Sequence, residues 1–338
     1  MSTRRNVSSV DVARRAGVSQ TTVSYVLNDR RDVAIPEATR QRVLDAALQL
    51  GYRANASARS MRTGRFGCVA LVRSATSRHS TLFRGLLEGI EDALAEHDLH
   101  LTVARLSDRT LTDPEAVPKI LRQWMADGLL LNYQQDIPAR MQELIERHRL
   151  PSVWINSRHA ADCVHPDDLA AGRAAAEHLL GLGHARIAYG TIPTTHYSAA
   201  DRRAGHEAAL GAAGLAPRVL THAGDTSDGI PLWRETLSRP DRPTAVIAYM
   251  PHVAQAVFYA ALMLGLRVPQ DLSLSVFDMS PLKATGLPVT TWVIPDYAMG
   301  QGAVEMLVQK ITAPAAPLPP RVLPLGFAPG QTCAPPGG

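Results

Sequence analysis

A chain of 338 residues, 46% hydrophobic and 5% aromatic, is long enough for two or three globular domains, and no apolar run approaches the ~18 residues of a membrane span. Eleven Arg against five acidic residues give the first 64 residues a charge of +6 within a total of +4, which indicates an anionic polymer as their partner. The three cysteines are few and lie far apart, which argues against a disulfide framework and a zinc site. No apolar signal segment opens the chain, so we expect a cytoplasmic protein, without metal or cofactor.

Residues 1–54 are predicted to form three short helices. The first begins after Ser8, which has an acidic residue three positions later as in a capping box, and it ends at Gly17, which permits a tight turn. The second helix begins after Ser19 and the third follows Pro36, a residue that suits the start of a helix.

The second of these helices has one aliphatic arc and one polar arc. Val23, Val26 and Leu27 share an arc at ~100° per residue, so we expect them to be buried. The opposite arc carries amide, hydroxyl and phenol groups, from Gln20, Thr21, Ser24, Tyr25 and Asn28. Two short helices joined by a Gly-containing turn are typical of a helix-turn-helix, whose second helix reads base edges in the major groove. The alternative is an ordinary three-helix domain with a solvated polar face.

Residues 55–65 form a basic segment between this domain and the rest of the chain. Residues 56–61 have the pattern of one short helix, which is too short to be stable alone. An apolar side chain at the tip of a basic helix suits a minor-groove wedge, which makes Met61 the candidate. A plain interdomain linker is the alternative.

From Phe66 onward, strand-like and helix-like stretches alternate. The expected strands are 68–72, 101–104, 128–131, 152–155, 186–189, 245–248 and 272–277, with a terminal strand around 320–327. The expected helices are 82–97, 137–148, 170–182, 203–213, 252–264 and 297–310. This alternation predicts doubly wound parallel sheets, and the length suits two α/β lobes.

The segments "SSVDVARRAGVSQTTVSYVLN" and "PEATRQRVLDAALQLGYRANASARSMRTGR", followed in order by the later segments, resemble the LacI/GalR family of bacterial transcriptional repressors. The resemblance implies base contacts from Gln20, Thr21 and Tyr25. It implies phosphate contacts from Ser19, Thr22, Ser24 and Asn28, and minor-groove contacts from the hinge residues Ala58, Met61 and Arg62. Many members of the family have Arg where Tyr25 stands, so we expect the operator preference to differ at that position.

The resemblance also implies a periplasmic-binding-protein-like core of two α/β subdomains after an all-α helix-turn-helix domain. Residues 1–54 would form the DNA-binding domain, 55–65 the hinge and 66–338 the ligand-binding and dimerisation core. The first subdomain would comprise about 66–164 plus 293–318, and the second about 165–292 plus 319–338, with an effector cleft between them.

Three residues are candidates for the effector cleft. Arg202 matches a family Arg that reaches into the cleft, and Asp278 matches the first Asp of a Phe-Asp-Asp signature; a solvated Arg and a capping Asp are the alternatives. Trp292 is a candidate lining residue, with a core position as its alternative. Met250 and Met279 stand where the family has polar groups. We therefore expect either an effector that is less hydroxylated than an aldose, or anionic with Arg202 as its anchor, or no effector at all.

Together these features predict a homodimeric transcriptional repressor that binds a near-palindromic operator of double-stranded DNA. A small-molecule effector between the lobes would modulate its affinity, and no catalytic residues are assigned. A solute-binding protein of a transport system, which shares the core, is the alternative, although the basic N-terminal module counts against it. An α/β enzyme is a second alternative, against which counts the absence of any nucleophile–base set in the sequence.

Overall fold

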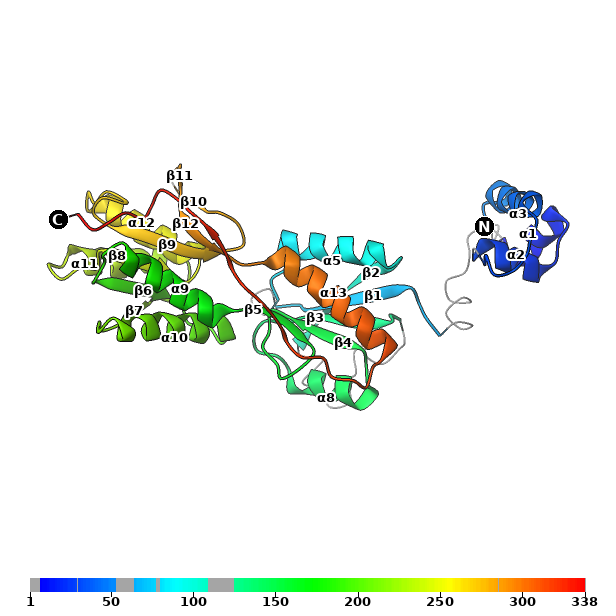
Figure 1. The fold of residues 1–338 in the computed structure, drawn as a ribbon, viewed down its shortest axis with the longest axis horizontal. Helices are drawn as coiled ribbons and strands as arrows, with labels where there is room; N and C mark the ends of the chain where they lie inside the picture. The colour runs from blue at the N-terminus through cyan, green and yellow to red at the C-terminus, as the bar shows by residue number, and fades with distance from the viewer. Residues whose placement is uncertain are drawn as a thin grey trace. The chain divides into compact units, whose positions relative to one another are not determined.

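The computed structural model describes residues 7–28, 30–52, 64–76, 80–108, 125–284 and 286–337. The chain divides into two compact units, Met1–Phe66 and Gly67–Gly338 (Figure 1). No helix within these described ranges is long and apolar enough to cross a membrane.

The first unit is a bundle of α1 (Ser9–Ala16), α2 (Gln20–Leu27) and α3 (Glu37–Leu50). Its core contains the fully buried Val12, Val23 and Val43, one from each helix. The predicted capping box is confirmed, because the Ser8 side chain accepts from the backbone of Asp11 and the Asp11 carboxylate accepts from Ser8. The turn after α1 is also confirmed. Its glycine has a left-handed φ of 67°, a conformation that favours glycine.

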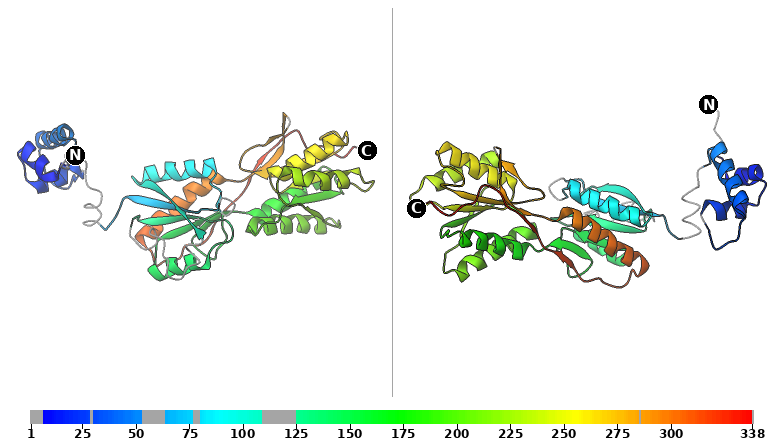
Figure 2. Two further views of the ribbon diagram at one scale, coloured as in Figure 1. Left: turned by 180° about the vertical axis from the view of Figure 1, so that it is seen from behind. Right: turned by 45° about the horizontal axis from the view of Figure 1, so that its top comes forward.

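The first lobe of the second unit is built on a parallel sheet of strand order β13-β5-β4-β3-β1-β2 (Figures 1 and 2). The strands are β1 (Cys68–Ser74), β2 (His100–Leu106), β3 (Gly128–Asn132), β4 (Ser152–Ile155), β5 (Cys163–Pro166) and β13 (Arg321–Leu323). The helices are α5 (Arg84–Glu96), α8 (Ala139–His148) and α13 (Asp296–Thr312). Alternate residues of β1 serve the two faces: Val69 and Leu71 pack with α5 and α13, whereas Ala70 and Val72 pack with α8.

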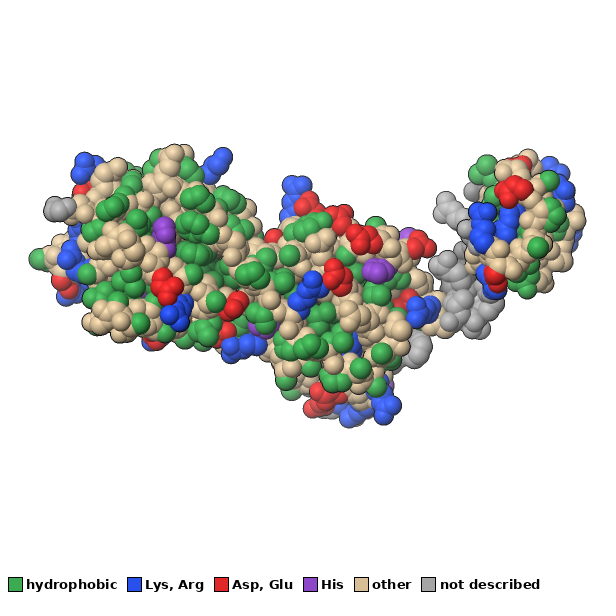
Figure 3. All heavy atoms as spheres, viewed as in Figure 1, with side chains coloured by type: hydrophobic (Ala, Val, Ile, Leu, Met, Phe, Trp, Pro, Cys, Tyr) green, Lys and Arg blue, Asp and Glu red, His purple; other side chains and the backbone are tan. Residues whose placement is uncertain are grey.

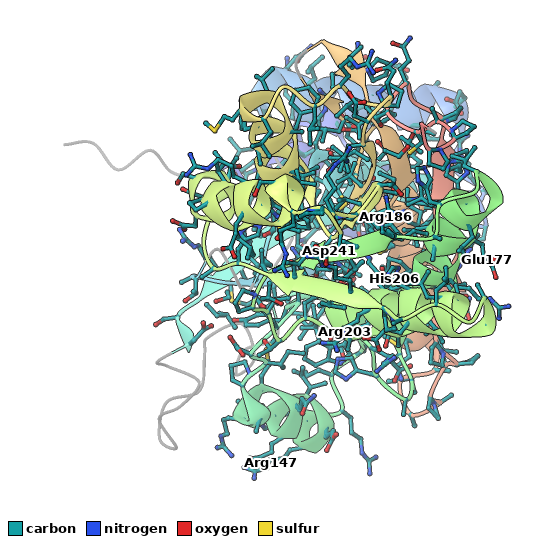
Figure 4. All side chains as sticks on the ribbon, turned by 90° about the vertical axis from the view of Figure 1, so that its left-hand side faces the viewer. Arg147, Glu177, Arg186, Arg203, His206 and Asp241 are labelled. Carbon is teal, nitrogen blue, oxygen red and sulfur yellow. The ribbon has the colours of Figure 1, made fainter. Side chains whose placement is uncertain are left out.

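The second lobe has a sheet of strand order β14-β12-β9-β8-β6-β7, in which β14 is antiparallel to β12. The strands are β6 (Ile187–Thr191), β7 (Arg218–Thr221), β8 (Ala245–Ala248), β9 (Ser273–Asp278), β12 (Thr290–Val293) and β14 (Gly326–Ala328). The helices are α9 (Asp168–Gly181), α10 (Tyr197–Ala212), α11 (Thr226–Ser238) and α12 (Pro251–Met263). Figure 4 shows α9 and α10 on one side of this sheet and α11 and α12 on the other. A small hairpin of β10 (Lys283–Ala284) and β11 (Leu287–Pro288) precedes β12.

These two lobes confirm the predicted doubly wound fold. The chain passes from the first lobe to the second between Pro166 and Asp168, returns between Val293 and Asp296, and passes again after Leu323. The last passage lies later than the expected boundary at 319, because β13 still pairs with β5 in the first sheet and only β14 joins the second.

Candidate functional site

The first candidate surface is the polar face of α2. Gln20, Thr21 and Asn28 are exposed, while Ser24 and Tyr25 are partly buried at the edge of that face. The buried Val23 and Val26 point into the bundle, as the sequence predicts, and Leu27 packs against the same core while partly exposed. The hinge candidates Ala58, Met61 and Arg62 lie outside the described residues.

Several side chains of this face are held by hydrogen bonds before any partner is bound. The Ser19 hydroxyl accepts from the Thr22 amide at 3.0 Å and lies 2.9 Å from the Thr22 hydroxyl. Gln20 Nε2 donates to Ser9 Oγ at 2.8 Å, which leaves its Oε1 available as an acceptor. Asn28 Nδ2 donates to the Ser24 carbonyl at 2.6 Å. The face therefore presents uncharged donors and acceptors in fixed positions.

The charge around this face is basic. The three-helix unit exposes Arg14, Arg15, Arg30, Arg31 and Arg42, and Figure 3 shows Lys and Arg side chains in blue on the face of this unit that it draws. By contrast, the same figure shows carboxylate groups gathered over α5 of the core. A helix that presents uncharged readers among arginines suits a polyanion whose base edges are read.

The second candidate site is a cavity of about 420 Å³ lined by residues of both lobes. Its walls are the segments that follow the carboxyl ends of the parallel strands, which is where ligands bind in open α/β sheets. The first lobe contributes Thr81, Phe83, Gln134, Gln135 and Asn156. The second lobe and the crossover residue Ile294 contribute the rest, namely Ile192, Thr194, His196, Ser198, Arg202, Tyr249, Met250, Pro251, His252, Phe277, Asp278, Met279 and Ile294.

Arg202 lines this cavity but is already paired. Its side chain is only 5% exposed, and its Nε lies 2.7 Å from Oδ1 of Asp168, whose side chain is fully buried. Nη1 donates to the Tyr249 carbonyl at 3.1 Å, and the guanidinium carbon lies 4.4 Å from the ring centroid of Phe277. Because Asp168 balances its charge, Arg202 offers an anion little net attraction.

Asp278 also lines the cavity, directly at the end of β9. Its Oδ1 accepts from the Met279 amide at 2.7 Å, and burial raises the pKa of its carboxyl. His196 lies on the same cavity, and burial lowers its pKa to about 4, so its ring is neutral at pH 7. The polar groups of the cavity therefore supply hydrogen bonds rather than positive charge.

The structure does not bring Trp292 to this cavity. Trp292 lies on β12, is 9% exposed, and packs against Phe327 and His178 in the core beside α9 and α10. Its Cα partner in the neighbouring strand, Phe277, does line the cavity.

Some site residues were not predicted from the sequence. Asp168 and His196 were missed because α9 and α10 begin earlier than the pattern indicates, at Asp168 and Tyr197. Asn156 lines the cavity with a left-handed φ of 52°; asparagine is enriched in this conformation, but its residue type alone does not place it at the cavity. Arg40 is buried on α3 and its Nη2 donates to the Arg30 carbonyl at 2.6 Å; its spacing from the buried Val43 is a signal that could have found it.

A small helix-turn-helix unit with an uncharged reading face, followed by a two-lobed core with a ligand-sized cavity, defines a ligand-binding transcriptional regulator. Comparison of the chain with known protein families and relatives agrees with this class. Residues 10–55 match the family described as bacterial regulatory proteins, lacI family, and residues 176–333 match a periplasmic binding protein-like domain. The chain is 31% identical to the HTH-type transcriptional repressor PurR of Edwardsiella ictaluri over 312 residues, covering 90% of each chain. It is also 31% identical to the ribose operon repressor of Escherichia coli over 316 residues, covering 90% of this chain and 93% of that protein.

This protein belongs to the LacI family of bacterial regulatory proteins. Its fold is similar to that of the lac repressor dimer bound to operator and the anti-inducer ONPF, with a TM-score of 0.81 at 23% identity over 98% of this chain and all of the other. A transcriptional regulator CelR in complex with cellobiose aligns with a TM-score of 0.67 at 26% identity, covering 97% of this chain and 100% of that chain. Within the described part of the chain, no group of three or more His, Cys, Asp or Glu side chains could hold a metal ion.

Proposed function

We propose that this protein is a cytoplasmic transcriptional repressor that binds a near-palindromic operator as a homodimer, with its affinity set by a small effector in the cavity between the lobes. The observation that carries the proposal is the polar face of α2, where Gln20, Thr21 and Tyr25 carry no charge, in a unit that exposes several arginines. The relatives named above are repressors, and one similar solved structure is a repressor dimer on its operator. One such unit buries little surface, so two copies on paired half-sites supply the affinity.

The control mechanism follows from the cavity being lined by both lobes. A ligand that contacts Gln134 or Asn156 on one side and Arg202 or Asp278 on the other favours one relative orientation of the lobes. If the two orientations differ in how they hold the DNA-binding units of the dimer, ligand binding and operator binding are linked. No residue is assigned a catalytic role.

The effector is an uncharged molecule with few hydroxyl groups. This assignment is supported by the pairing of Arg202 with Asp168, which removes the counter-charge that an anion would need. It is also supported by Met250 and Met279, whose apolar side chains give a sugar no hydrogen bonds on their part of the wall. Of the effector classes that the sequence left open, the anionic one is therefore disfavoured.

A panel of ligands of matched size tests this assignment. We expect uncharged, sparsely hydroxylated molecules to raise the melting temperature of the full chain and to change its operator affinity, because both effects follow from binding the folded core. Hexoses and sugar phosphates at the same concentration should do neither. Met279→Trp, which fills part of the cavity, is the control and should abolish the ligand-induced rise. Stronger stabilisation by sugar phosphates than by uncharged ligands would contradict the assignment.

A further inference from the structure

The segment that follows α2 turns back so that Arg30 lies beside Tyr25. The Arg30 amide donates to the Tyr25 carbonyl at 3.0 Å, and the Arg30 carbonyl accepts from the buried Arg40 at 2.6 Å. Both the backbone N–H and the backbone carbonyl of Arg30 are therefore hydrogen-bonded. These two bonds fix the position of the Arg30 Cα relative to α2.

The side chain of Arg30 is held on two sides as well. Its guanidinium carbon lies 5.8 Å from the ring centroid of Tyr25, within the range of a cation–π contact. Its Nε donates to Asp32 Oδ1 at 2.6 Å, and its Nη2 pairs with the second carboxylate oxygen of Asp32. The planar guanidinium is thus restrained by a two-point ion pair on one side and contacts a reading residue on the other.

An exposed pair of this kind contributes little to folding, since the side chains of Arg30 and Asp32 are 48% and 58% exposed. The position of this pair beside the reading face of α2 matters more for DNA binding than its contribution to stability. An unpaired carboxylate next to the reading face would repel phosphate, and an unpaired guanidinium would be drawn to any phosphate regardless of sequence. The pair cancels both tendencies while leaving Arg30 in contact with the Tyr25 ring.

We propose that Arg30 is a positioning residue for DNA reading: it orients the phenol of Tyr25, and Asp32 restrains Arg30 from non-specific phosphate contact. The inference rests on the proposed function, in which α2 reads the operator. It adds Arg30 and Asp32 to the determinants of operator specificity, although neither belongs to α2.

Substitutions in the full chain separate the two roles, with base preference measured by selection from random duplexes and non-specific affinity measured on unrelated DNA over a salt series. Asp32→Asn should strengthen non-specific binding about threefold to tenfold and steepen the slope of log affinity against log salt by about 0.9, because one more cation reaches a phosphate. Arg30→Met should lower specific affinity about tenfold and change the bases preferred where Tyr25→Ala also changes them.

The double variant Arg30→Met/Asp32→Asn is decisive, because it removes both charges. Non-specific affinity should return to that of the wild type, whereas the altered base preference should persist. If base preference also returns to that of the wild type, Arg30 acts through charge alone and the positioning role is overturned. Arg14→Met is the matched control, because it removes one exposed arginine of the same unit whose ion-pair partner is Asp11 rather than a residue beside α2, and it should leave base preference unchanged.

A measurement without DNA keeps this proposal separate from the proposed function. In ¹⁵N-arginine-labelled full chain, the Nε–H resonance of Arg30 should shift on Tyr25→Leu substitution, because the ring current is lost. An unchanged resonance overturns the contact whatever the DNA experiments show. Failure of the wild-type chain to select any DNA sequence, with the shift observed, would refute the proposed function and the reading role but not the contact.

Discussion

Replacement of Asp168 by Ala is expected to lower the free energy of unfolding of the core by roughly 3–5 kcal/mol, because it leaves the buried Arg202 guanidinium without its carboxylate. Both side chains are almost fully removed from solvent, so water cannot compensate. Urea denaturation of the full chain, followed by tryptophan fluorescence, measures the loss.

Two further variants define what the Asp168 result means. Asp168→Leu combined with Arg202→Met removes both charges and should recover most of the stability, since apolar residues of similar volume often replace a buried pair at little cost. Glu177→Ala breaks an exposed pair with Arg173 on the same helix, where Glu177 points outward in Figure 4, and should cost at most about 0.5 kcal/mol. A loss below 1 kcal/mol for Asp168→Ala would contradict the buried pair and, with it, the neutral cavity from which the effector class is inferred.

Gly205→Ala is expected to destabilise the second lobe by about 3 kcal/mol or more, because α9 and α10 cross too closely to admit a side chain there. A Cβ at Gly205 would lie 2.1 Å from the Leu169 carbonyl oxygen and 2.6 Å from the Arg173 nitrogen. These are backbone atoms, so relief requires the helices to separate. The loss would appear in urea denaturation of the full chain.

Gly211→Ala on the same helix is the matched control. A Cβ at Gly211 meets no heavy atom within 4 Å, so alanine should stabilise the helix by about 0.5–1 kcal/mol. Equal effects at Gly205 and Gly211 would contradict the close crossing. The crossing bears on function because Gly172 of α9 faces the Arg202 carbonyl, so the same packing sets where Arg202 meets Asp168.

The sequence predicts much of this fold because many of its signals are local. The capping box at Ser8 and the turn at Gly17 depend on residues within one turn of helix. The buried strands β4 and β8 are short runs of mostly apolar residues and lie where the pattern indicates. The helix α11 was missed because Gly229 and Pro231 interrupt its pattern, and Pro231 lies inside the helix, where it removes one intrahelical hydrogen bond. The assignment of β13 to the first sheet depends on its pairing with β5, where Arg321 lies opposite Val164. No local signal in the sequence reports a pairing between residues so far apart.

The candidate site was predictable only in part for a related reason. A residue at the carboxyl end of a strand, such as Asp278, faces the ligand-binding edge of a parallel sheet wherever the strand lies. For Trp292, inside a strand, the outcome depends on which face its side chain takes, and that face is set by packing against α9. The partner of Arg202 could not be predicted, because Asp168 is 34 positions away and meets it only through the crossing of α9 and α10.

The most direct test of the account is selection of genomic fragments by the full chain, followed by titration of the selected DNA over a series of salt concentrations. We expect enrichment of a few near-palindromic sites that are bound at least about a thousandfold more tightly than unrelated DNA, with log affinity falling linearly with log salt for both. Enrichment of no sequence, or equal affinity for selected and unrelated DNA at every salt concentration, would contradict the claim that α2 reads an operator.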